Sequence, residues 1–253
     1  KRDKVRAYAT GLYFSEGGDL TKKLVDEALS YQEMGFDAIK MKVGLGIKKD
    51  MINVKSVREA VGPDLELMID ANHAFSLKES IVLSRKLEGL DIGWFEEPMS
   101  PEHYQCYREL REKTSIPVSG GECEYLRSGF LNLFQQRSVD IAQPDICAAG
   151  GITEVKKIAD MAHAFGVELV PHTWGTGINI SAALQVLASL EDVPGRMFNP
   201  EMFLELDQTE NPLRDEVVTL ELNIQNGRVQ IPDLPGLGID VNEDEMRKYL
   251  VNS

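Results

Sequence analysis

Short apolar segments alternate with longer amphipathic stretches along most of the chain, and this alternation constrains the fold more than any other feature. The apolar segments, which we expect to be strands, are residues 5–14, 36–43, 65–70, 91–97, 116–122, 139–145, 167–172 and 197–207. The stretches between them carry apolar residues at helical spacing, and we expect helices at 20–34, 48–61, 76–88, 101–113, 124–136, 151–165 and 176–190.

Strictly alternating strands and helices are typical of an α/β protein with a parallel sheet and right-handed crossovers. Eight strands in residues 1–207 fit a TIM-type barrel of the (β/α)7β kind, and a doubly wound open sheet is the alternative. From residue 208 the chain contains Pro and Gly punctuation and short alternating segments. We therefore predict a catalytic barrel at 1–207 and a C-terminal tail at 208–253 that packs outside it.

Composition excludes several classes of function. The chain is 43% hydrophobic, which suffices for a large core, and its net charge of -14 repels the phosphates of nucleic acids. No apolar run approaches the roughly 20 residues that a membrane crossing needs, and no secretory signal is visible. The three cysteines, Cys106, Cys123 and Cys147, cannot all pair and show no metal-ligand spacing. We expect a cytoplasmic protein with free thiols and no membrane partner.

Ionisable side chains stand at the carboxyl ends of six consecutive predicted strands, where parallel barrels carry their active sites. Three of them are carboxylates spaced 26 residues apart, at Asp70, Glu96 and Glu122. Adjacent strands would point these carboxylates at one centre, where they repel one another unless a cation joins them. Because the set contains only oxygen ligands, it favours a hard ion such as Mg²⁺.

Two further pairs surround this centre. Lys40 and Lys42 share one face of a strand, so Lys40 can neutralise charge that develops on a substrate oxygen and Lys42 can act as a neutral base. Asp145 and His172 end neighbouring strands, and a carboxylate beside an imidazole fixes its tautomer. A dication, three carboxylates and two ammonium groups leave one positive charge, so the site can accept a small carboxylate substrate.

The motifs KMK (40–42), DAN (70–72), WFEEP (94–98), GGE (120–122), QPD (143–145) and PHTWGTG (171–177) resemble the enolase superfamily. Within it the sequence is similar to the mandelate racemase subgroup, because Asp145 and His172 occupy the sixth and seventh strands. The muconate-cycloisomerase and dipeptide-epimerase subgroup carries a lysine on the sixth strand instead. The superfamily is known for a Lys or His base that works with Mg²⁺.

The resemblance implies a role for each matching residue. It implies Mg²⁺ ligands at Asp70, Glu96 and Glu122, bases at Lys42 and His172, a partner of His172 at Asp145, contacts to the substrate from Lys40 and Glu205, and supporting groups at Asn72 and Glu97. The family normally begins with an α+β capping domain, which we expect this sequence to lack and on which the tail would pack. Self-association into a homo-oligomer is a further expectation.

The expected reaction is Mg²⁺-dependent removal of the proton α to a carboxylate, through an enediolate held by the metal and Lys40. Loss of a β-hydroxyl would dehydrate an acid sugar to a 2-keto-3-deoxy acid, which is our first prediction. Return of the proton on the other face would make a racemase or epimerase of a 2-hydroxy acid. A catalytically silent binding barrel is the non-enzymatic alternative. Phosphate-ester chemistry is disfavoured, because PHTWGTG lacks a Gly-rich phosphate signature.

Overall fold

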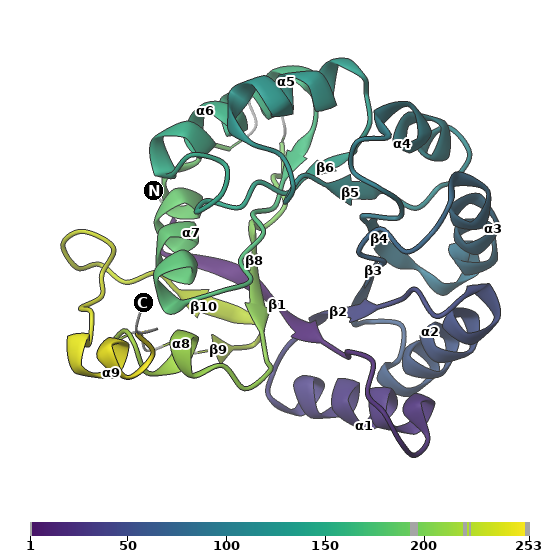
Figure 1. Ribbon diagram of the computed structural model, residues 1–253, viewed down its shortest axis with the longest axis horizontal. Helices are drawn as coiled ribbons and strands as arrows, with labels where there is room; N and C mark the ends of the chain where they lie inside the picture. The colour runs from purple at the N-terminus through teal and green to yellow at the C-terminus, as the bar shows by residue number, and fades with distance from the viewer. Residues whose placement is uncertain (1, 193–196, 220–221, 223, 251–253) are drawn as a thin grey trace.

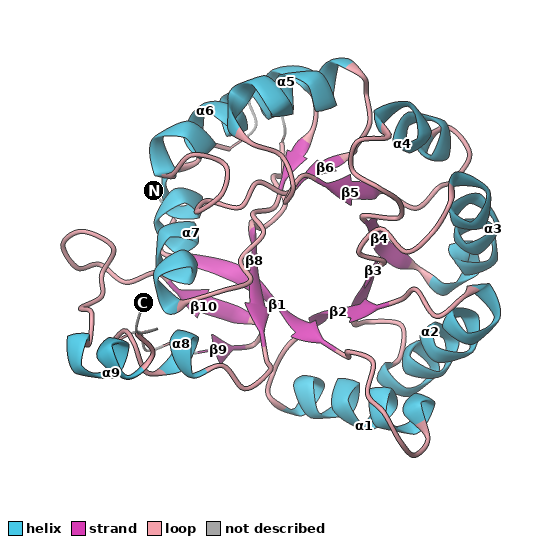
Figure 2. Ribbon diagram, viewed as in Figure 1, coloured by secondary structure: helices cyan, strands magenta, loops and turns pink. Residues whose placement is uncertain are grey.

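A computed structural model describes residues 2–192, 197–219, 222 and 224–250 of the chain. Strands form a ring around a central axis and helices cover the outside of the ring (Figures 1 and 2). The strands of the ring are β1 (Lys4–Gly11), β2 (Ala38–Lys42), β3 (Glu66–Asp70), β4 (Ile92–Glu96), β5 (Val118–Gly120), β6 (Ile141–Ala142), β7 (Glu168–Leu169) and β8 (Phe203–Asp207).

The helices between the strands begin and end close to their predicted positions. They are α1 (Leu20–Glu33), α2 (Ile47–Val61), α3 (Leu77–Leu87) with the short 3₁₀ turn η1 (Glu88–Leu90), α4 (Tyr104–Arg111), α5 (Leu126–Gln135), α6 (Ile152–Phe165) and α7 (Gly177–Ser189). Ser76 caps α3, because its hydroxyl accepts from the backbone N–H of Glu79 while the Glu79 carboxylate accepts in return from the backbone N–H of Ser76. No helix in the described part of the chain is both long and apolar enough to span a membrane.

Parallel pairing runs through the sheet in chain order from β1 to β7, and β8 pairs with the free side of β1. The α/β class and the parallel sheet are therefore confirmed. Between β7 and β8 no ladder forms among the described residues, and side-chain contacts bridge this seam instead. Thr173, which follows β7, donates its backbone N–H to Glu205 Oε2 at 3.0 Å and its hydroxyl to the carbonyl oxygen of Glu205 at 2.6 Å.

The inside of the ring is built in two layers, because alternate residues of each strand point inward. The first layer is apolar: Tyr8, Trp94 and Phe203 meet edge to face with ring centroids 5.3–5.8 Å apart. Two residues further along the same strands, the inward side chains become Thr10, Glu96 and Glu205. The apolar layer therefore closes the bottom of a polar centre near the carboxyl ends of the strands.

Outward-facing strand residues make the main core with the helices. Ile39 and Met41 of β2 and Leu67 and Ile69 of β3 are fully buried in it. Several predicted strands are longer than those in the structure. Residues 197–202 are not a strand, since Pro200 offers no backbone N–H and the apolar side chains of Met197 and Phe198 are largely exposed.

A second difference is at the first strand, which was predicted to run to residue 14. It ends at Gly11, because Leu12 adopts a left-handed backbone with φ of 52° and turns the chain away. The regular parts of β6 and β7 are also shorter than predicted. Pairing resumes beyond them, where Asp145 and His172 form an isolated parallel bridge.

The tail after residue 207 contains α8 (Pro212–Asp215), β9 (Ile224–Gln225), β10 (Arg228–Gln230) and α9 (Glu243–Lys248). The β9–β10 hairpin adds to the start of β1, where Val229 pairs antiparallel with Val5. Arg228 also donates to Asp37 at 2.5 Å. The hairpin thus packs beside the amino ends of the strands, whereas the start of the tail lies at their carboxyl ends, where Asn211 donates to the carbonyl oxygen of Gly175 and Arg214 to that of Asp207. A capping domain, self-association and a cytoplasmic location stay predictions.

Candidate active site

A cavity opens at the carboxyl ends of the strands, and most of the predicted site residues line it. They are Lys40, Lys42, Asp70, Asn72, Glu122, His172 and Glu205. Asp145 lines an adjoining pocket that shares Glu122 and His172 with this cavity. Pairing in the sheet explains the convergence, since Asp70 is the register partner of both Lys42 and Glu96. The structure therefore brings together side chains that the sequence separates by more than a hundred residues.

Lys40 is buried at the centre of the site, where it contacts two carboxylates. Its side chain is 1% exposed, and its Nζ donates to Glu96 Oε1 at 2.5 Å and lies 2.7 Å from Glu205 Oε1. The ring centroid of Tyr8 lies 5.5 Å from the same nitrogen. Burial alone would lower the pKa of Lys40, but Glu205 and Glu96 outweigh it and hold the pKa well above the usual value. Its two carboxylate neighbours therefore stabilise Lys40 as a cation in the metal-free site.

Glu205 and Glu96 flank Lys40 and differ in their environment. Glu205 accepts from the Thr10 hydroxyl at 2.7 Å, and although burial opposes ionisation, Lys40 and His172 hold its pKa below the usual range. Glu96 accepts from Trp94 Nε1 at 2.9 Å and Gln143 Nε2 at 2.5 Å. Burial raises the pKa of Glu96 to about 7 against the opposing effect of Lys40. A further positive charge nearby would therefore stabilise the ionised form of Glu96.

Lys42 stands nearer the opening of the cavity. Its Nζ donates to Asp70 Oδ2 at 2.5 Å and to Asn72 Oδ1 at 2.7 Å. The backbone N–H of Asn72 in turn donates to Asp70 Oδ1 at 2.9 Å. Asn72 therefore supports both Lys42 and Asp70, as the sequence predicts for a neighbouring group.

His172 and Asp145 form the predicted dyad. His172 Nδ1 lies 2.8 Å from Asp145 Oδ2, and its Nε2 lies 3.4 Å from Glu122 Oε2. Burial would lower the pKa of His172, but the hydrogen bond to Asp145 and the charges of Glu205 and Glu122 raise it to about 9. With Nδ1–H donated to Asp145, the nitrogen that can exchange a proton in the cavity is Nε2.

Asp145 is held rigidly enough to orient this imidazole. Its Oδ1 accepts from the backbone N–H groups of Cys147 and Ala148 at 2.8 and 3.1 Å, and its Oδ2 also accepts from Asn179 Nδ2 at 3.1 Å. Burial opposes ionisation of Asp145, but the hydrogen bond and charge of His172 keep its pKa below the usual value. The two residues are therefore an ion pair in the metal-free site.

Replacing Asp145 by asparagine is expected to lower the pKa of His172 in the metal-free protein from about 9 toward its ordinary value, while the charges of Glu205 and Glu122 continue to raise it. The variant keeps the burial that disfavours the imidazolium and removes the carboxylate that stabilises it. The histidine would then be protonated only at lower pH. Titration of its ring signals by NMR measures this shift, and an unchanged pKa in the variant would contradict the role of Asp145.

The charge of the donor set suits a hard divalent cation, but among the described residues the group whose ligand atoms all lie within 4.8 Å of one another is His73, Glu97 and Cys123 and not the predicted set Asp70, Glu96 and Glu122, which stays a prediction. Four carboxylates and two ammonium groups lie in or next to the cavity, namely Asp70, Glu96, Glu122 and Glu205 with Lys40 and Lys42. The excess of two negative charges is what one dication would neutralise, and because Glu205 adds to the three predicted carboxylates, the residual positive charge expected from the sequence is not left over. Three of the carboxylates, Asp70, Glu96 and Glu205, are 1% exposed, so they cannot rely on water for this purpose. Without a metal, the lysine ammonium groups hold Asp70 and Glu96.

Several residues of the site were missed by the sequence analysis. Thr10 supports Glu205, and Gln143 supports Glu96. Trp174 Nε1 donates to the Tyr13 hydroxyl at 3.1 Å, so these two aromatic side chains form a wall of the cavity. Strand alternation could have found Thr10, which lies two residues after the inward Tyr8. The Tyr13–Trp174 contact joins loops after β1 and β7, and no sequence spacing indicates it.

Glu97, for which the resemblance implies a supporting role, does not line the cavity but lies close to the proposed metal ligands Glu122, Asp70 and Glu96, and its supporting role stays a prediction. Its carboxylate lies 2.6 Å from His73 Nε2, and burial together with the charges of Glu122 and Asp70 raises its pKa to about 9. Among the described residues, its group with His73 and Cys123 has the spacing of a metal site.

Known proteins resemble the chain over nearly its whole length. The sequence model of the family described as "Enolase C-terminal domain-like" matches residues 23–245. D-galactarolactone cycloisomerase of Agrobacterium fabrum is 43% identical over 98% of the chain and 66% of its own length. Arabinonate dehydratase of Saccharolobus solfataricus is 37% identical over 99% of the chain and 65% of its own length.

Solved structures agree with this resemblance. The crystal structure of the 3,6-anhydro-D-galactonate cycloisomerase from Zobellia galactanivorans has a TM-score of 0.91 and 53% identity, covering 100% of the chain and 68% of that protein. A putative mandelate racemase from Bordetella bronchiseptica has a TM-score of 0.89 and 33% identity, covering 98% of the chain and 65% of that protein. The chain spans 62–66% of the length of the curated relatives named cycloisomerase or dehydratase that it matches.

Proposed function

The chain belongs to the enolase C-terminal domain-like family, and from this premise we propose that it removes the proton α to the carboxylate of a sugar acid. A β-oxygen then leaves, and the product is a 2-keto-3-deoxy acid. One observation carries the proposal: the Asp145–His172 dyad and Lys42 reach a single cavity that also contains Lys40 and an excess of carboxylates.

His172 and Lys42 are the groups placed to move a proton. Asp145 occupies Nδ1 of His172, so Nε2 can take the α-proton or deliver a proton to the departing oxygen. Lys42 Nζ lies on β2, several strands away from the loop that carries His172. The two groups can therefore act on different sides of the same substrate.

Mg²⁺ is the cofactor that we propose for the carboxylates Asp70, Glu96 and Glu122. When bound, it would supply positive charge that stabilises negative charge on the substrate carboxylate. Lys40 adds a fixed positive charge to the same region, and Glu205 and Glu96 hold its ammonium in place. Tyr13 and Trp174, joined by a hydrogen bond, line one side of the cavity.

The names of the relatives favour sugar acids and differ in the group that leaves. Two relatives are named dehydratases of arabinonate and D-xylonate, and two others are named cycloisomerases of D-galactarolactone and 3,6-anhydro-D-galactonate. A 3,6-anhydro ring places an ether oxygen on C3, which is β to the carboxylate. Removal of the C2 proton would expel that oxygen and open the ring without loss of water. A free 3-hydroxyl would leave as water instead.

β-Elimination is thus one step that yields dehydration or ring-opening isomerisation, depending on the substrate. We propose dehydration of open-chain sugar acids and, because of the cycloisomerase relatives, ring opening of a cyclic sugar acid as the second candidate. Racemisation uses the same α-proton removal but needs the proton to return on the other face.

Incubation of the full-length protein with Mg²⁺ in D₂O separates these outcomes. The substrates are aldonates with a free 3-hydroxyl and anhydro or lactone forms of sugar acids. We expect a new ketone that reacts with semicarbazide, with loss of one water from aldonates and with unchanged composition, apart from deuterium, from cyclic acids. Inversion with deuterium uptake and no ketone would establish the racemase alternative. If no acid exchanges its α-proton and none yields a ketone, a silent binding protein is supported.

A further inference from the structure

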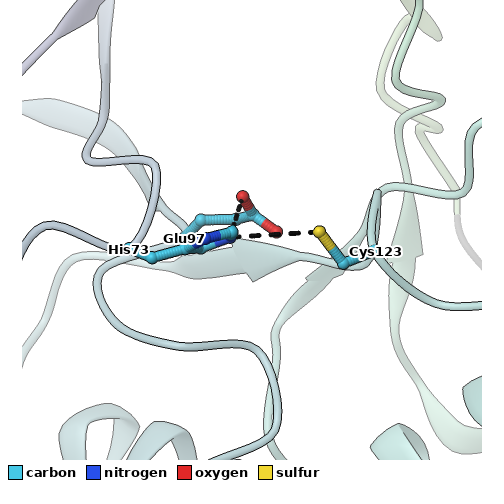
Figure 3. Close-up of side chains that lie close together, drawn as sticks. All are labelled: His73, Glu97 and Cys123. Carbon is cyan, nitrogen blue, oxygen red and sulfur yellow. Dashed lines mark hydrogen bonds and ion pairs between the residues drawn. The ribbon is translucent and has the colours of Figure 1, made fainter.

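Three side chains converge at the ends of three adjacent strands beside the cavity (Figure 3). His73 follows β3, Glu97 follows β4 and Cys123 follows β5. His73 Nε2 lies 2.6 Å from Glu97 Oε2 and 4.0 Å from Cys123 Sγ, and one potential ligand atom of each residue lies within 4.8 Å of the others. Neither Lys42 nor His172 needs this group for the proton transfer proposed above.

The environment of the Glu97 carboxylate indicates that this group of residues binds a ligand. Its side chain is 1% exposed, and neither of its oxygens has a hydrogen bond of ordinary geometry among the described residues. His73 approaches one oxygen from the exposed side, and its side chain is 35% exposed. Buried carboxylates without hydrogen bonds are costly unless a cation offsets their charge.

We propose that His73, Glu97 and Cys123 bind a borderline-soft divalent cation, of which Zn²⁺ is the representative, at a site distinct from the Mg²⁺ carboxylates. An imidazole nitrogen, a thiolate sulfur and a carboxylate oxygen are ligands of Zn²⁺ in proteins, whereas Mg²⁺ avoids sulfur. Tetrahedral Zn²⁺ ligands lie about 3.5 Å apart, and small side-chain movements reach this spacing from the observed one. Water would take the fourth position on the exposed side of His73.

The backbone supports a site at this place. His73 and Glu97 both adopt left-handed backbone conformations, with φ of 69° and 38°. Such conformations are costly for residues other than glycine and are retained where the surrounding structure requires them. Here they turn the ends of β3 and β4 so that the two side chains meet.

Cobalt(II) is the probe that tests the proposal, because it binds in place of Zn²⁺ and reports its ligands by absorption. The full-length protein is first saturated with Mg²⁺ so that the oxygen ligands are occupied, and Co²⁺ is then titrated. We expect an intense near-ultraviolet thiolate-to-cobalt band that saturates at one cobalt per chain and disappears when Zn²⁺ is added. Cobalt held only by oxygen ligands gives no such band.

Cys123→Ser should abolish the band and His73→Gln should weaken cobalt binding at least tenfold. Cys106→Ser is the matched control, since Cys106 is also partly buried and free but lies on α4, and it should leave the titration unchanged. A band that persists in Cys123→Ser, or no band in the unmodified protein, would overturn the proposal.

Alkylation of the unmodified protein provides a measurement that does not depend on the folding of a variant. Zn²⁺ should slow the reaction of Cys123 with iodoacetamide at least tenfold, as read by peptide mass spectrometry, and should not slow that of the exposed Cys147. Equal rates at Cys123 with and without Zn²⁺ would refute the site even if cobalt absorbed elsewhere.

Discussion

His172→Asn is expected to reduce the rate of product formation on sugar acids by ~10³-fold, within the range that a positioned acid or base contributes. Asparagine is close in size and can still donate to Asp145, but it cannot take up or release a proton at the position of Nε2. His172 Nε2 lies 3.4 Å from Glu122 Oε2, which is a long contact, and it makes no closer contact to the other proposed metal ligands. The affinity for Mg²⁺ should therefore change little.

The measurement combines steady-state kinetics with calorimetric titration of Mg²⁺. His163→Asn is the matched control, because His163 lies in the last turn of α6, away from the cavity, and its replacement should leave kcat/KM unaltered. Full activity of His172→Asn on every isomer would refute its assignment as a proton carrier. Residual exchange of the α-proton on one face alone would identify Lys42 as the base for that face.

The sequence predicts the site well where strand register decides the geometry. The spacing of 26 residues between Asp70 and Glu96 corresponds to one strand, one helix and the loops that join them, and the two residues are direct register partners in the sheet. The alternation of inward and outward residues likewise places Lys40 and Lys42 on one face. These features depend on local periodicity, which the sequence displays.

The depth of a side chain in the ring is harder to predict than its direction. Lys40 and Lys42 are only two residues apart, yet Lys40 is 1% exposed while Lys42 remains accessible. Lys40 is enclosed because Glu205 of β8 lies against it. The sequence analysis predicted that strand to begin at residue 197, but β8 begins at Phe203. Contact of Lys40 with a substrate carboxylate therefore stays a prediction.

The sequence does not show which side chains in different loops come into contact. His73, Glu97 and Cys123 carry no recognisable metal-ligand spacing, and each lies next to or near a residue with a more obvious role. They come together because β3, β4 and β5 are neighbours in the sheet, and His73 and Glu97 adopt left-handed backbone conformations just after their strands end. The β9–β10 hairpin is a similar case, since its pairing with β1 joins residues more than two hundred positions apart.

Lys40→Met is expected to lower the free energy of unfolding of the metal-free protein by about 3–5 kcal/mol, because it leaves buried charges without a partner. Methionine fills a similar volume, but Glu96 and Glu205 then face each other across an apolar side chain. The pKa of Glu96, which is already raised, would rise further, and that of Glu205 would rise above its value in the unfolded chain. The loss of stability should therefore be small near pH 4 and should grow as the pH rises toward 8.

Urea unfolding at several pH values measures this effect. Lys55→Met is the matched control, because Lys55 pairs with Glu59 on the exposed face of α2, and it should cost no more than about 1 kcal/mol. A second substitution and the addition of Mg²⁺ should each restore part of the lost stability. Glu205→Leu in the same chain removes one of the stranded charges, and Mg²⁺ supplies the missing positive charge if Glu96 is one of its ligands. A Lys40→Met protein that is as stable as the parent at pH 8 would contradict the buried ion-pair network. If Glu205→Leu restores stability but Mg²⁺ does not, the ion-pair network is supported and Glu96 is not a Mg²⁺ ligand in this variant.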